Sequence, residues 1–121
     1  MKINIKTVCT AAILALSISV QADSTSAEKI AETVKKSVSA QPQKVIEIVS
    51  SQVAQNDSVA CEIVKAAIVA SHADKDLVAE IVQAATEAAP DKIRIIGQCA
   101  VAVAPDAIAE VQTVITKFAA A

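Results

Sequence analysis

The chain has 121 residues, of which 54% are hydrophobic and 20% charged, and a formal net charge of −2. Binding to a phosphate backbone needs Lys and Arg gathered on one face, which this acidic balance does not favour. Phe118 is the single aromatic residue, so the side chains that stack on bases or sugars are scarce. We therefore expect no nucleic-acid partner and no carbohydrate partner.

Residues 1–22 have the three parts of a secretory signal peptide. Two lysines precede a short apolar run at residues 8–20, and Ala22 ends a small-residue cleavage site before Asp23. A membrane anchor is the weaker interpretation, because an apolar run of about 13 residues is shorter than the ~20 that span a bilayer. We expect cleavage between Ala22 and Asp23 and export to the periplasm or the extracellular space.

Residues 23–121 then form a single domain, the mature protein. Cleavage removes Lys2 and Lys6 and no acidic residue, so the net charge falls to −4. A chain of roughly 100 residues buries about two thirds of its unfolded surface, which is enough for one core. Helices that lie on membranes usually carry Lys and Arg on their polar face. We therefore expect no stable membrane span in the mature form, and the acidic balance weakens the case for a membrane-surface role.

Helix-start signals divide the mature chain into six predicted helices. Thr25 with Glu28 three residues later forms a candidate capping box, and Asp57 and Asp74 are candidate N-caps. Three prolines stand where a first helical turn tolerates them, and an aspartate follows two of them, beside the positive end of the helix dipole. Together with apolar spacings of three and four, these signals predict helices at residues 26–39, 43–54, 58–71, 75–88, 90–103 and 105–118.

The apolar stripes of these helices form the predicted core. A sheet is the alternative, because Val and Ile favour strands and residues 100–103 alternate. Ala, the best helix former, is the commonest residue, and Gly97 is the only glycine, so the turn residues that a sheet needs are few. We therefore predict an all-α fold. Its predicted core residues are Ile30, Val34, Val38, Val45, Ile48, Val49, Val53, Ile63, Val64, Ala67, Ile68, Val78, Ile81, Val82, Ala85, Ile93, Ile96, Ala100, Val103, Ile108, Val111, Ile115 and Phe118.

A faint repeat of about 33 residues relates residues 42–74 to residues 75–107. A two-helix period is typical of stacked helical hairpins in a short solenoid, and a small antiparallel bundle remains the alternative. The repeat predicts that the paired isoleucines are buried and that the paired glutamates face solvent. The identical pairs are Val45 with Val78, Glu47 with Glu80, Ile48 with Ile81, Val49 with Val82, Ile63 with Ile96, and Ala67 with Ala100.

Short motifs in this region carry a resemblance to other proteins. They are the Glu-Ile-Val-Lys-Ala-Ala-Ile block at residues 62–68 and the Ala-Pro-Asp-x-Ile helix starts at residues 89–93 and 104–108. They resemble those of small, secreted, Ala- and Val-rich helical proteins of bacteria that are themselves uncharacterised. The resemblance covers most of residues 42–118. It implies a helical fold and export, and it implies no activity and no site.

Cys61 and Cys99 are the two cysteines of the mature chain, and they form a candidate disulfide. Export favours this interpretation, because disulfides persist in oxidising compartments. A bridge also needs Cα atoms within about 7 Å, a distance that the sequence does not supply. The alternative is two small apolar side chains at helix interfaces.

His72, the only histidine, stands near Asp74 and Asp76 and could form a weak metal site with them. The favoured interpretation is structural, with His72 at the negative end of one helix and the aspartates at the start of the next. Ser71 adjoins His72, but neighbouring residues on a helix point about 100° apart, which does not suit a nucleophile and its base. We therefore expect no metal, no cofactor, no catalytic residue and no enzymatic activity.

Four glutamates recur at similar points of their predicted helices. A carboxylate cluster is one interpretation, and a solvated helix face is the favoured one, because each acid lies beside the apolar stripe. The four are Glu47, Glu62, Glu80 and Glu110.

These features favour an exported, non-enzymatic helical module that presents its surface to an unknown protein partner. Stacked hairpins commonly bind through repeated helix faces. The alternative is a carrier of a small apolar ligand or lipid, because a core of Ala and Val with little aromatic filling can leave a cavity between helices.

The export hypothesis predicts that protein from the native host begins at Asp23. Intact-mass analysis of the exported fraction measures this directly. A soluble cytoplasmic product that keeps residues 1–22 would contradict the hypothesis.

Overall fold

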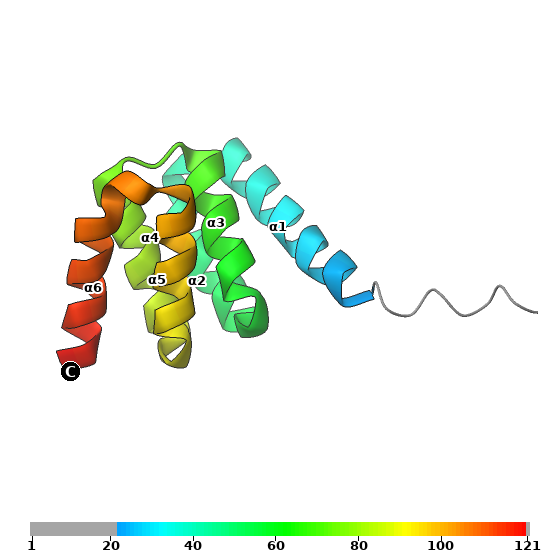
Figure 1. Cartoon of the computed structure of the whole chain (residues 1–121). Coiled ribbons are helices and arrows are strands. Elements are labelled where there is room, and N and C mark those ends of the chain that lie inside the picture. Colours follow the sequence, from blue (N-terminus) through cyan, green and yellow to red (C-terminus); the bar gives the residue numbers. More distant parts are fainter. Residues whose placement is uncertain (1–21, 121) are drawn as a thin grey trace, which may run out of the picture.

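The computed structural model describes residues 22–120, with side chains from residue 26 onward, and these residues form six α-helices (Figure 1). The predicted signal peptide, apart from its last residue Ala22, lies outside the described residues. No strand occurs between residues 22 and 120, so the predicted all-α fold is confirmed. The helices are α1 (Ala22–Ala40), α2 (Val45–Gln55), α3 (Ala60–Ser71), α4 (Lys75–Ala88), α5 (Ile93–Val103) and α6 (Ile108–Ala120).

Four of the helices are preceded by a single 3-10 turn. Prolines open three of these turns, because the fixed φ of proline suits a first helical turn and its missing N–H is not needed there. The predicted helices began at or one residue after the first residue of each turn, and the structure shows that the α-helix proper begins three residues after each proline. The turns are η2 (Pro42–Lys44), η3 (Asp57–Val59), η4 (Pro90–Lys92) and η5 (Pro105–Ala107).

The predicted N-terminal caps have different outcomes. Asp74 caps α4 as predicted, since its Oδ1 accepts a hydrogen bond of 2.9 Å from the backbone N–H of Leu77. The prediction for Asp57 was wrong: it is the first residue of η3, and Asn56 before it has no side-chain cap bond. Asn56 instead donates its side-chain amide to the Gln52 carbonyl, 3.1 Å away, and so satisfies the end of α2. The first helix also starts earlier than predicted, at Ala22, so Thr25 lies inside α1.

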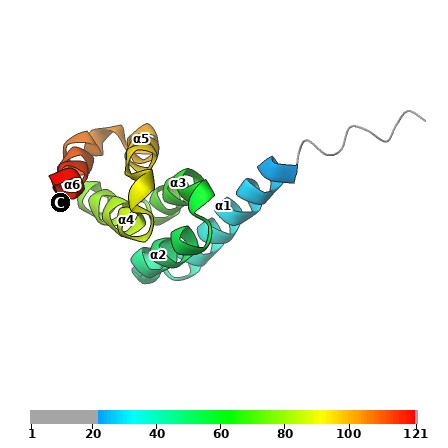
Figure 2. The same ribbon diagram turned by 90° about the horizontal axis from the view of Figure 1, so that it is seen from below.

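The helices stack in two layers. In Figure 2 the odd-numbered helices α1, α3 and α5 form one row, and the even-numbered helices α2, α4 and α6 form the other. Within each row neighbours pack together, α3 against both α1 and α5, and α4 against both α2 and α6. The chain therefore forms three hairpins, α1–α2, α3–α4 and α5–α6, stacked side by side. The first half of α1 diverges from this stack (Figure 1).

The hairpins share a register of 33 residues. α3 and α5 begin at Ala60 and Ile93, and η2 with α2 together spans residues 42–55, which correspond to α4 at residues 75–88. Positions 33 residues apart are called equivalent below. Several sets of equivalent residues share burial along the rows, and the exceptions lie on the two end hairpins. The fully or almost fully buried sets are Ile63 with Ile96; Val34 with Ala67 and Ala100; and Val45 with Val78 and Val111.

Most predicted core residues are buried, and the misplaced ones fall near the ends of the stack. Ile81 is fully buried, whereas Ile48, which was predicted to be buried as well, is only half-buried against the core. The reason is position: α4 is covered by a helix on each side, and α2 belongs to an end hairpin. Ile108 is 54% exposed although the pattern placed it in the core. Half-buried members of the predicted core are Ile30, Ile48, Ile93, Val103, Ile115 and Phe118.

Replacing Ile81 with Ala should lower the free energy of unfolding by about 2 to 5 kcal/mol, because it removes fully buried methyl groups and leaves a cavity. Ile48→Ala should cost only about 1 to 2 kcal/mol, since this side chain keeps part of its surface in water. Glu80→Gln is the control, with an expected change below about 0.5 kcal/mol at an exposed position. Urea denaturation measures all three, and equal losses for Ile81→Ala and Glu80→Gln would contradict this packing.

Candidate functional site

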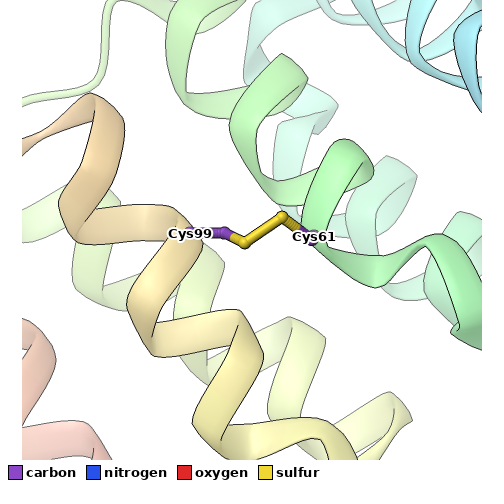
Figure 3. The surroundings of a disulfide bond; sticks show 2 residues. All are labelled: Cys61 and Cys99. Carbon is purple, nitrogen blue, oxygen red and sulfur yellow. A yellow bond between two sulfur atoms is a disulfide. The ribbon is translucent and has the colours of Figure 1, made fainter.

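A disulfide bond joins Cys61 of α3 to Cys99 of α5 (Figure 3). The two Cα atoms are 5.5 Å apart, and 38 residues separate the cysteines in the chain. Because α3 and α5 belong to neighbouring hairpins of the same row, the bond crosses the interface between the second and third hairpins. The bond therefore links two hairpins that otherwise contact each other only through non-covalent packing.

The residues around His72 have structural roles. His72 ends α3 in the left-handed conformation, with φ 51° and ψ 46°, and its backbone N–H bonds back to the helix. The Ser71 hydroxyl donates to the Ile68 carbonyl, and the Asp74 carboxylate caps α4. No group of three or more His, Cys, Asp or Glu within residues 22–120 is placed to hold a metal ion.

The four glutamates of the sequence pattern differ in their surroundings. Glu47 and Glu80 are exposed, as predicted, whereas Glu62 and Glu110 are half-buried. Glu110 lies beside Asp106 and the start of α4, where Asp74 is the N-cap and Lys75 and Asp76 belong to the first turn. These acids and Lys75 line a shallow hollow. None of them lines the apolar groove that is described next.

An apolar groove lies between α5 and α6, and it is here called the α5–α6 groove. Its volume is about 500 Å³, and Arg94 is the charged residue in its lining. Ile93, Ile108 and Ile115, which the sequence pattern assigned to the core, lie along it. The complete lining is Ile93, Arg94, Gly97, Gln98, Val101, Ile108, Val111, Gln112, Ile115 and Ala119.

Gly97 is buried in the lining of this groove, where the side chains of Ile115 and Val111 pack against it. A Cβ atom built on Gly97 would lie 2.5 Å from Cδ1 of Ile115 and 3.7 Å from Cγ1 of Val111. Glycine destabilises a helix interior by about 1 kcal/mol relative to alanine, so its presence here needs a packing reason. The Ile115 side chain, which occupies the space that a Cβ atom would need, supplies that reason.

Sequence reasoning missed the groove. The available signal was that α5 and α6 carry apolar stripes as full as those of α3 and α4, although α3 and α4 pack against helices of both neighbouring hairpins. The pattern predicts that the apolar stripe of the α5–α6 hairpin belongs to the core, whereas part of this stripe faces outward.

No family model, no curated protein and no solved structure matches the chain. Within residues 22–120, none of the helices has both the length and the apolar character needed to cross a bilayer. The groove therefore has to be interpreted from its own residues.

Replacing Cys61 and Cys99 together with Ala should lower the free energy of unfolding by about 3 to 4 kcal/mol, because the bond closes a loop of 38 residues in the unfolded chain. Ala stands at residue 66, the position equivalent to Cys99, so the helix itself tolerates the change. Urea denaturation gives the loss, and native protein under reducing conditions should match the double variant. Alkylation of two cysteines in denatured, unreduced protein would rule the bond out.

Proposed function

We propose that the chain is an exported, non-enzymatic interaction module that binds a protein partner through the α5–α6 groove. The observation that carries this proposal is an apolar groove of about 500 Å³ that is open to solvent along Ile108, which is 54% exposed. Exposed apolar surface gathered in one place costs free energy in water, and a partner that covers it regains that free energy.

The chemistry of the lining supports binding rather than catalysis. Apart from Arg94, its polar side chains are the two amides Gln98 and Gln112, which are neutral and do not titrate. Nucleophilic catalysis needs an activated nucleophile beside a base, and proton transfer needs a titratable group near the substrate. The lining offers neither, and it offers aliphatic surface for contact.

A carrier of a small apolar ligand or lipid is the second candidate function. Its support is the volume, since ligand pockets commonly measure about 300 to 1,000 Å³ and are lined by apolar side chains. Such pockets bury most of the surface of their ligand, about 70 to 90%. Half of the Ile108 side chain faces solvent, which suits the flat contact of a protein better than the enclosure of a small molecule.

Site-specific photo-cross-linking in the producing cell tests the proposal. A photoreactive phenylalanine analogue at Gln98, which is exposed and lines the groove, should give a protein adduct. The same analogue at Gln43, which is exposed in η2 and lies outside the groove lining, is the matched control.

A second comparison assigns the adduct to the groove. Ile108→Lys should remove the adduct, and Ile95→Lys should keep it, because Ile95 is a similarly exposed isoleucine on α5, at 45%, that does not line the groove. A lipid adduct at Gln98 would favour the carrier. Equal labelling at Gln98 and Gln43 would contradict a role for the groove.

A further inference from the structure

The α5–α6 groove is the third of a series, and the first two are filled by helices. α3 packs against both α1 and α2, and α5 packs against both α3 and α4. Each hairpin thus receives the odd-numbered helix of the next hairpin between its own two helices. The described chain ends with α6 at Ala120, and no helix within residues 22–120 lies over the third groove.

Burial at equivalent positions shows that this is the same kind of surface. Ile93, Val101 and Ile115 in the groove are half-buried. Their equivalents Ala60, Ile68 and Val82 are at most 4% exposed, and they belong to α3 and α4, which α5 contacts. The difference in burial at these three positions is the one expected where a covering helix is absent among the described residues.

We propose that the occupant of the α5–α6 groove is an amphipathic α-helix of a partner protein, seated as the next odd-numbered helix would be, with a carboxylate opposite Arg94. This inference rests on the proposed function and deepens it, because it states the secondary structure and the charge of the partner segment.

The register places Arg94 at a contact point. Arg94 is equivalent to Cys61, and Cys61 is bonded to Cys99 of the next odd-numbered helix. The partner residue that takes the place of Cys99 therefore lies next to the Arg94 guanidinium. A cation at the edge of an apolar groove favours a partner with the opposite charge, and an arginine binds a carboxylate with two parallel hydrogen bonds.

The residues of α5 define what the partner helix presents. Ile96 and Ala100 are fully buried on α5, and Val103 is half-buried beside residues of α1 and α3. Transferred to the partner with an acid in place of Cys99, this gives the pattern Ile-x-x-(Asp or Glu)-Ala-x-x-Val. The groove residues of α6 span 108–119, about 16 Å at 1.5 Å per residue, which matches a helix of three turns.

The first helix of a second copy fits this pattern poorly. The α1 residues equivalent to Cys99 and Val103 are Thr33 and Ser37, so α1 would bring two hydroxyls to an apolar surface. Thr33 is exposed, and its hydroxyl donates to the Lys29 carbonyl at 2.9 Å. At these two positions α1 is polar where α5 is apolar or small, which favours a different protein over a head-to-tail copy.

The test uses the purified protein and two synthetic peptides. Both have the sequence of residues 90–104; one carries Cys99→Glu and the other Cys99→Lys. Fluorescence anisotropy measures binding, and circular dichroism measures the helix content of the peptide. We expect the Glu peptide to bind about tenfold more tightly than the Lys peptide and to gain helix on binding.

Variants of the protein complete a charge-reversal cycle. Arg94→Glu should reverse the order of the two peptides, and Ile108→Lys should weaken both by at least about tenfold. Ile95→Lys should leave both unchanged. Arg94, Ile95 and Ile108 are all exposed, so the variants keep the fold, which circular dichroism of the protein checks.

Equal binding of the two peptides, or an Arg94→Glu variant that leaves their order unchanged, would overturn the carboxylate. No peptide binding at all would overturn the helical occupant, while a protein adduct at Gln98 would still support the proposed function. Analytical ultracentrifugation of the protein alone tests whether a second copy of the chain occupies the groove. Self-association that Ile108→Lys abolishes would assign the groove to a second copy and would overturn the proposal of a different partner protein.

Discussion

Packing between hairpins is the interaction on which the rest of this structure depends. α3 and α4 of the middle hairpin each have six buried residues, whereas α2 and α5 have three and α6 has two. A pair of short helices made of Ala and Val has too little apolar surface to form a core of its own, so each hairpin is stable only against its neighbours. The half-burial of Ile48 and the exposure of Ile108 follow from this constraint.

Small side chains decide how closely the hairpins approach. Ala60 and Ala100 are buried on α3 and α5, and small side chains such as these are compatible with the 5.5 Å between the Cα atoms of Cys61 and Cys99. The same composition limits what each contact contributes, since a buried methyl carries little apolar area. The disulfide complements such an interface by lowering the entropy of the unfolded chain.

The helices could be predicted from local signals, because proline, aspartate and apolar spacing act within a few residues. Asp74 shows the strength of such signals, and Asp57 shows their limit, since a single acid before an apolar run fits either an N-cap or a 3-10 turn. Exposure depends instead on what lies across an interface. The residues next to Ile108 in the sequence do not indicate that its side chain is exposed. Likewise, the residues next to Thr86 do not indicate that its hydroxyl is buried without a hydrogen-bond partner among the described residues. The groove could therefore not be predicted from local sequence signals.

The register of 33 residues makes the chain extensible by whole hairpins. An in-frame duplication of residues 57–89 would insert a unit whose two faces already match their neighbours, whereas an insertion of one residue within a helix would turn the following stripe by about 100°. Such a duplication would also leave one copy of Cys61 without a cysteine opposite it, because the equivalent of Cys99 in the middle hairpin is Ala66. In an oxidising compartment that thiol would form bridges between molecules, so growth of this protein would select for loss of the extra cysteine.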